Sequence, residues 1–176
     1  MSAKLKRPKA STLCGFAPLL IYPDDTYKKH ALDWQKAVGM YYVTAGDLLE
    51  KFNQEISKLT TSDLEEIFTR TFDMAPVCVP YISAHIFGDE NYERGKLMSG
   101  LLDRYSEIGF DYGREMPDHV AVVLRFAGQC QDDELQELIE YVLSEPIKQM
   151  ADSLSGSDNP YQWLLLSILE ILRAKS

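Results

Sequence analysis

The side chains best placed to do chemistry lie in one short segment, Glu115-Met116-Pro117-Asp118-His119. We expect a helix to open here, with Met116 as its N-cap, because proline at the first helical position lacks only an N–H that would have no partner. Asp118 would then face the positive end of the helix dipole, where a carboxylate is stabilised. A cation is disfavoured at that end, so His119 is expected to be a neutral imidazole that both donates and accepts. Such a segment suits hydrogen bonding to a peptide.

The sequence also limits the chemistry that this segment could perform. The three histidines, His30, His85 and His119, do not have the spacing of a metal-binding motif, and no phosphate-binding glycine loop or serine-hydrolase motif is present. We therefore expect no metal and no cofactor, and an enzyme would have to be built from residues scattered along the chain. An acid–base pair of Asp118 and His119 is the enzymatic alternative, although adjacent helical residues point about 100° apart. The pattern alone favours structural roles for this pair.

The composition is that of one folded, acidic domain. The chain has 176 residues, of which 45% are apolar, and its net charge is −9. That charge argues against binding to nucleic acids or to anionic membranes, and it favours a partner that is basic where it docks. The three cysteines, Cys14, Cys78 and Cys130, are odd in number and far apart. They predict neither a disulfide framework nor a zinc site, so a reducing cytoplasm is the expected location.

The N-terminus imitates a secretory signal only superficially. Four basic residues precede an apolar run over residues 13–22: Lys4, Lys6, Arg7 and Lys9. Pro18 interrupts the run, and no small-residue cleavage site follows it. No apolar segment is long enough to span a membrane, so no direct membrane insertion is expected. We expect residues 1–12 to form a basic, flexible tail and residues 13–176 to form an all-helical domain.

Apolar residues recur at helical spacing along almost the whole chain. Several signals mark where these helices begin and end: a capping box at Ser62-Asp63-Leu64-Glu65, glycine ends at Gly88 and Gly109, and Pro146, which kinks or ends a helix. No segment alternates in the manner of a strand between turn signals. The pattern predicts an all-α, single-domain bundle of about eight to nine helices.

The last predicted helix differs from the others because residues 163–172 are apolar on nearly every side. Such a helix is normally buried, so it should pass through the core or be covered by a second subunit. A flexible joint over residues 153–158 precedes it, and Asn159-Pro160 is expected to open it. The protein could therefore be a monomer or a domain-swapped homodimer.

Several segments, taken together and in order, resemble the NarJ-type delta-subunit chaperones of nitrate reductases, part of the wider TorD and DmsD group. The resemblance spans most of the chain. Its segments are Leu19-Leu20-Ile21-Tyr22-Pro23-Asp24-Asp25, Phe72-Asp73, His85-Ile86-Phe87-Gly88-Asp89-Glu90 with Arg94-Gly95, Leu101-Leu102-Asp103-Arg104-Tyr105 with Gly109, and Glu115-Met116-Pro117-Asp118-His119 with Leu124 and Phe126. The last of these is the family's best-known signature.

The resemblance implies an all-α chaperone and not a catalyst. Such a chaperone binds the N-terminal peptide of a molybdopterin oxidoreductase's catalytic subunit, a twin-arginine signal or its remnant. It holds the apoenzyme for insertion of the molybdenum cofactor before membrane targeting or export. An acidic body and a bundle groove with aromatic edges agree with a basic, apolar peptide as the ligand.

The resemblance also implies which residues bind this peptide. Asp118 and Glu115 are expected to accept charge-assisted hydrogen bonds from its arginine or lysine side chains, with Pro117 beside them. His119 would orient the peptide backbone or Asp118. Four further residues on the matched motifs are expected at the site, mainly as apolar walls: Tyr81, His85, Phe87 and Phe126. For these side chains the alternative interpretation is core packing with polar tips at the surface.

A third role stays open beside the chaperone and the enzyme. The chain could be a stable accessory subunit of a membrane-associated oxidoreductase, held through its apolar terminal helix. Copurification with the mature enzyme in fixed stoichiometry would distinguish that role from a transient chaperone.

Overall fold

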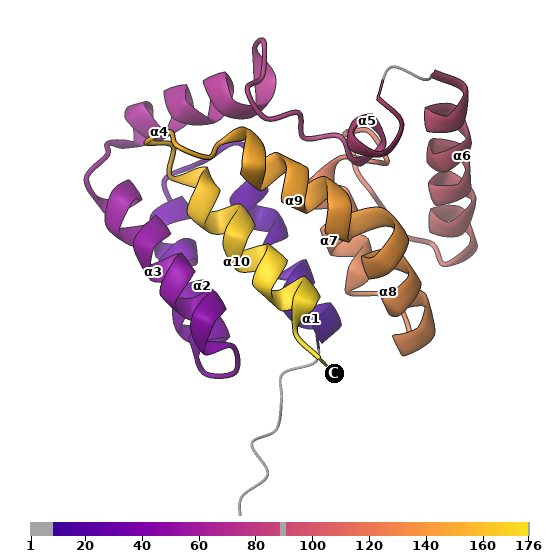
Figure 1. Cartoon of the computed structure of the whole chain (residues 1–176), viewed down its shortest axis with the longest axis horizontal. Helices are drawn as coiled ribbons and strands as arrows, with labels where there is room; N and C mark the ends of the chain where they lie inside the picture. Colours follow the sequence, from indigo (N-terminus) through magenta and orange to yellow (C-terminus); the bar gives the residue numbers. More distant parts are fainter. Residues whose placement is uncertain (1–8, 89–90, 176) are drawn as a thin grey trace, which may run out of the picture.

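The structure is a computed structural model that describes residues 9–88 and 91–175. Its α-helices pack as a single bundle (Figure 1), and they are α1 (Lys9–Cys14), α2 (Tyr27–Gly39), α3 (Val43–Ser57), α4 (Thr61–Phe68), α5 (Ile82–Phe87), α6 (Asn91–Glu107), α7 (Val120–Ala127), α8 (Asp132–Leu138), α9 (Ser144–Ser153) and α10 (Tyr161–Arg173). A 3-10 segment, η1 (Ala17–Leu20), and two π segments, η2 (Thr69–Asp73) and η3 (Ile139–Leu143), lie between them. The described residues contain no β-strand, so the predicted all-α, single-domain fold is confirmed.

Helix α10 lies at the centre of the bundle, between α3 and α9 (Figure 1). Its side chains are buried around most of its circumference, including Leu164, Ile168 and Ile171. The hydroxyl of Ser167 is also buried, and it donates to the Ala45 carbonyl at 2.8 Å, so its polar atom has a partner. The expectation that the terminal helix passes through the core is therefore confirmed within one copy of the chain.

Helices α2 and α3 approach each other closely at two glycines, Gly39 and Gly46. A Cβ atom built on Gly46 would lie 2.5 Å from the Cα of Gly39, closer than non-bonded carbon atoms approach in proteins. The absence of side chains at this point therefore sets how closely the two helices pack.

The N-terminal helix α1 occupies part of the segment for which the sequence predicts a flexible tail. Residues 9–12 are helical, and Thr12 and Leu13 are buried against the bundle. The Lys9 ammonium donates to the carbonyls of Leu172 and Ala174, at 3.3 and 2.6 Å. A cation is favourable at the C-terminal end of α10, where carbonyl groups lack helical partners. Lys4, Lys6 and Arg7 lie outside the described residues.

Two helix boundaries differ from the sequence prediction. Helix α4 begins two residues earlier than its expected capping box, because Thr60 and Asp63 form an equivalent box upstream. The Thr60 N–H donates to the Asp63 carboxylate at 2.8 Å, and the Asp63 N–H donates to the Thr60 hydroxyl at 3.1 Å. Pro146 does not end a helix, since it lies in the first turn of α9, where its missing N–H costs little. The helical backbone is continuous from α8 through the π segment η3 into α9.

Helices α5 and α6 form as predicted and lie at one edge of the bundle (Figure 1). Gly88 ends α5 with φ of 59°, and Gly109 follows α6 with φ of 64°, a backbone region that glycine adopts without strain. Asp89 and Glu90, which belong to the matched motif, lie outside the described residues.

Candidate functional site

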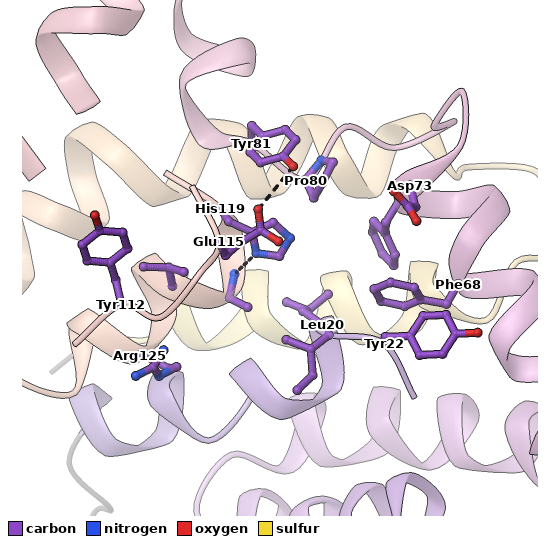
Figure 2. A pocket seen from close by; sticks show the side chains of 14 residues that line it. Leu20, Tyr22, Phe68, Asp73, Pro80, Tyr81, Tyr112, Glu115, His119 and Arg125 are labelled. Atoms are coloured by element: carbon purple, nitrogen blue, oxygen red, sulfur yellow. Dashed lines mark hydrogen bonds between the residues drawn. The ribbon is translucent and has the colours of Figure 1, made fainter. Parts of the chain in front are cut away.

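A pocket of about 310 Å³ opens beside the start of α7 (Figure 2). Segments far apart in the sequence supply its walls: the end of η1, α4 with η2, the residues before α5, the loop before α7, and α7 itself. Its lining residues are Leu20, Ile21, Tyr22, Phe68, Phe72, Asp73, Pro80, Tyr81, Tyr112, Glu115, His119, Ala121, Val122 and Arg125. The segment Glu115-Met116-Pro117-Asp118-His119, called the signature segment below, therefore borders the pocket. Only Glu115 and His119 of this segment belong to the lining.

Helix α7 begins at Val120, three residues after the expected start at Pro117. His119 is its N-cap, with φ of −61° and ψ of 134°, and the His119 Nδ1 atom accepts a hydrogen bond from the Ala121 N–H at 3.2 Å. The expected N-cap, Met116, lies in the preceding loop, where its carbonyl accepts from the His119 N–H at 3.1 Å. The helix starts late because the imidazole, and not a Met116 group, satisfies one of the first helical N–H groups.

Three hydrogen bonds, one to α6 and two to the segment at the start of α5, fix the loop that precedes α7. The Tyr105 hydroxyl donates to the Pro117 carbonyl at 2.9 Å. The Ile82 N–H donates to the Asp118 carbonyl at 2.9 Å, and the Val120 N–H donates to the Pro80 carbonyl at 2.8 Å. The last two bonds form an isolated antiparallel bridge between Tyr81 and His119. The loop before α5 and the loop before α7 therefore hold each other in place.

His119 is buried, and its ring lies edge-on to the ring of Tyr81, with 5.6 Å between centroids and 78° between planes. Burial lowers the pKa of His119 from its ordinary value of 6.5, and this effect outweighs the opposing influence of the carboxylates of Glu115 and Asp118. A neutral imidazole whose Nδ1 accepts must carry its proton on Nε2. The ring can therefore donate one hydrogen bond from Nε2, and Figure 2 shows the ring bordering the pocket.

Asp118 is 1% exposed and is absent from the pocket lining. Its carboxylate accepts from the Ser83 N–H at 3.2 Å and from the Ser83 hydroxyl at 2.5 Å. The Nε atom of Arg94 also donates to the Ser83 hydroxyl oxygen, at 3.1 Å. Asp118 thus satisfies an N–H in the first turn of α5 from a distant part of the chain. These contacts give Asp118 a positioning role, while its direct contact with a bound arginine stays a prediction.

Glu115 is exposed at the edge of the pocket. Its carboxylate accepts from the Met116 N–H at 2.9 Å and lies 3.4 Å from the Tyr81 hydroxyl, which points toward it in Figure 2. Burial raises the pKa of Tyr81, and the charge of Glu115 raises it further, so the phenol keeps its proton. The site thus presents a carboxylate together with a neutral donor.

Apolar side chains form the walls of the pocket and also part of its rim. Phe68 and Phe72 are buried, with 5.2 Å between their ring centroids, and η2 carries Phe72 and Asp73 into the lining. Segments of π-helix often occur at functional sites. At the rim, Ile21 is 51% exposed and Tyr22 is 55% exposed, with the Tyr22 ring edge-on to Phe68. Exposed apolar side chains beside an apolar hollow are typical of a binding surface.

Of the eight residues expected at the site, three line the pocket: Tyr81, Glu115 and His119. Pro117 and Asp118 lie directly behind it, buried in the loop that α5 and α6 hold. Within the signature segment, Glu115 and His119 therefore line the pocket, whereas Pro117 and Asp118 support the lining from behind.

The other three expected residues lie away from the lining. The Nε2 atom of His85 is 2.7 Å from the Val79 carbonyl, and it holds the segment that leads into α5. Phe87 is half-buried near the end of α5. Phe126 is buried in an aromatic cluster, with its ring centroid 5.0 Å from that of Tyr105. Roles in peptide binding for these three residues stay predictions.

Sequence reasoning missed most of the lining. Helical spacing assigns Phe68 and Phe72 to a core-facing stripe, and nothing in that spacing separates a pocket wall from a core residue. Tyr22 and Asp73 fall within segments that carry the family resemblance, and this position could have marked them as candidate site residues. Arg125 had no such signal, because an arginine on an amphipathic helix is ordinarily a solvated residue.

Neither a metal centre nor a membrane span is evident in the part of the chain that the structure describes. There, no group of three or more histidine, cysteine, aspartate or glutamate side chains is arranged to hold a metal ion. No helix within residues 9–88 and 91–175 combines the length and apolar character needed to cross a membrane.

The fold matches that of a protein described as "a putative redox enzyme maturation protein from Archaeoglobus fulgidus". The two structures align with a TM-score of 0.68 over 96% of this chain and 95% of the other, at 19% sequence identity. The likeness defines the class of fold, an all-helical bundle.

Residues 33–163 match the family model described as the nitrate reductase delta subunit. The chain belongs to this family. It is 26% identical over 165 residues to the "probable nitrate reductase molybdenum cofactor assembly chaperone NarJ" of Bacillus subtilis, covering 92% of this chain and 88% of that protein. It is 25% identical over 123 residues to the nitrate reductase molybdenum cofactor assembly chaperone NarJ of Escherichia coli K12, covering 68% of this chain and 52% of that protein.

Proposed function

We propose that this protein is a cytoplasmic assembly chaperone for a nitrate reductase. It binds the N-terminal peptide of the catalytic subunit and holds the apoenzyme until the molybdenum cofactor is inserted. Membership of the delta-subunit family and the names of the two NarJ relatives support the assembly role. The pocket beside α7 supports the peptide-binding role.

The observation that carries the proposal is the chemistry of this pocket. Apolar walls from Leu20, Phe68 and Phe72 suit an apolar side chain, and the exposed Tyr22 extends the apolar surface outward. The carboxylates of Asp73 and Glu115 at the edge suit lysine or arginine, and the net charge of −9 favours approach of a basic segment. An amphipathic helix laid into a bundle groove presents this combination of groups.

The hydrogen bonds disfavour an acid–base enzyme built on Asp118 and His119. The carboxylate of Asp118 is directed to Ser83, and the Nδ1 of His119 is directed to the backbone of α7. The two side chains therefore do not converge on one substrate position, which general acid–base catalysis requires.

Calorimetric titration with a synthetic peptide that carries the N-terminal sequence of the host's nitrate reductase catalytic subunit tests the proposal. The wild-type protein should bind it saturably. Tyr22→Ala should weaken binding about tenfold or more, since loss of a contacting aromatic at an interface costs of order 2 kcal/mol. Tyr141→Ala is the matched control, because Tyr141 is 68% exposed and lies on η3, outside the pocket lining.

Two outcomes would contradict the proposal. Absence of saturable binding by the wild-type protein would contradict the peptide-binding role. Copurification with the mature reductase in fixed stoichiometry would favour the stable accessory subunit over the transient chaperone.

A further inference from the structure

We infer that the peptide lies in one direction in this pocket, with its amino end over η2 and α4 and its carboxyl end beside Arg125. This inference rests on the proposed function, since it describes how the same ligand is held. It follows from the charges at the two ends of the pocket and from two further hollows that continue it.

Two of the three charged side chains in the pocket lining, Asp73 and Arg125, lie at its opposite ends, and the third, Glu115, lies between them beside His119. Figure 2 shows Arg125 and Tyr112 on one side, Asp73 and Tyr22 on the other, and His119 between them. Asp73 is exposed at the last position of η2. The pocket therefore has an anionic end and a cationic end.

The position of Arg125 is fixed by two contacts. Its Nη2 atom donates to the Asp111 carbonyl at 2.7 Å, and its guanidinium lies over the ring of Phe110, 5.2 Å from the centroid. A guanidinium has five N–H groups, and the contact with Asp111 uses one of them. The pre-oriented group can donate the others to carbonyl or carboxylate oxygens without a further loss of side-chain freedom.

The two ends of a peptide carry opposite charges, so they can be matched to the two ends of the pocket. An N-terminal peptide has an ammonium group at its start, and a helical conformation adds about half a positive charge at the amino end and half a negative charge at the carboxyl end. Its unpaired carbonyls lie at the carboxyl end. The amino end is therefore favoured near Asp73 and the carboxyl end near Arg125, whereas the reverse direction would bring like charges together.

A second hollow continues the pocket past Tyr22, which lines both. It has a volume of about 440 Å³ and includes Glu65, Glu66 and Met74. Glu66 pairs with Arg70, whereas Glu65 adds a second carboxylate beside that pair. An ammonium group or a basic side chain at the start of the peptide would find acidic surface here.

A third hollow continues the pocket at the opposite end, past Arg125, which again lines both. It has a volume of about 300 Å³, and its lining includes Ile108, Phe110 and Gln129. The three hollows give an elongated ligand a path from the acidic surface of α4, through the apolar pocket, to the guanidinium of Arg125.

Photo-cross-linking tests the direction directly. Two versions of the catalytic subunit's N-terminal peptide carry benzoylphenylalanine at the first or the last position, and each is titrated calorimetrically before irradiation with the full-length protein. Mass spectrometry should place the first version on residues 62–74 and the last version on residues 108–112 or 125–129. Asp73→Asn should weaken binding of the unlabelled peptide by up to about fivefold, the size of an exposed ion pair.

The outcomes separate the two claims. Saturable binding with cross-links in the reverse order, or spread equally over both ends, would overturn the direction and leave the proposed function intact. Absence of saturable binding by the unlabelled peptide would overturn the proposed function, and the direction with it.

Discussion

Asp118 accepts a hydrogen bond from the backbone N–H of Ser83, which lies 35 positions earlier in the chain, at 3.2 Å. The bond joins the signature segment to the first turn of α5. With the bridge between Tyr81 and His119, it sets the position of two of the pocket's walls. Asp118 therefore contributes to the site by holding the walls of the pocket in position.

Asp118→Ala should lower the free energy of unfolding by about 1–3 kcal/mol, because it leaves the buried N–H of Ser83 without its acceptor. Asp118→Asn should cost less, since an amide oxygen can still accept. Urea denaturation measures both variants. An alanine variant of unchanged stability that no longer binds peptide would instead support the direct contact predicted from the sequence.

The stability of the protein should fall as the pH drops below 6.5, partly through His119. In the unfolded chain an imidazole takes up a proton near its ordinary value of 6.5, whereas burial lowers the pKa of His119 in the folded protein. The unfolded state then binds more protons, so the free energy of unfolding decreases with falling pH. Thermal or urea denaturation over this pH range measures the decrease.

His119→Asn is the control for this pH dependence. Asparagine is a good N-cap, and its side-chain oxygen can accept from Ala121 in place of Nδ1, but it does not titrate. The variant should therefore show a smaller loss of stability at low pH than the wild-type protein. An unchanged pH dependence would contradict the assignment to His119.

Gly46→Ala should destabilise the protein by about 1–3 kcal/mol, because its new methyl group would meet the Cα of Gly39 on the neighbouring helix. Gly100→Ala is the matched control. Gly100 also lies in a helix, but a Cβ there meets nothing within 4 Å, so the gain in helix propensity should stabilise by about 0.5–1 kcal/mol. Equal effects on thermal unfolding would contradict the close approach of α2 and α3.

Ala75→Gly should stabilise the protein by about 1 kcal/mol. Ala75 has φ of 48°, the left-handed region that alanine rarely adopts, in the loop that follows Asp73. Glycine adopts that region without the clash of a Cβ, although it gains entropy in the unfolded chain. The midpoint of urea denaturation should rise, and a lower midpoint would contradict the strain.

Helical periodicity predicted the helices of this fold well because each buries a stripe of regularly spaced apolar residues. The terminal helix is the clearest case, since residues apolar on all sides require burial and α10 is buried. Boundaries were less predictable. The start of α7 depends on an imidazole acting as an N-cap, and propensity rules do not favour histidine there.

The site was predictable only in part, because long-range contacts assemble it. The sequence identified the segment from Glu115 to His119 as important through resemblance, but not which members line a pocket. That division depends on the pairing of the loop at Tyr81 with the loop at His119, which no local pattern specifies. The wall from η2 likewise depends on a π segment that spacing alone does not reveal.

Hydrogen exchange measured with and without the catalytic subunit's N-terminal peptide tests the central claim most directly. The account predicts that saturating peptide slows exchange of amides in residues 20–22, 68–73 and 112–122, the segments that supply most of the pocket lining. Exchange in α2 and in the outer face of α6 should not change. Protection confined to those helices, with the pocket segments unaffected, would contradict the account.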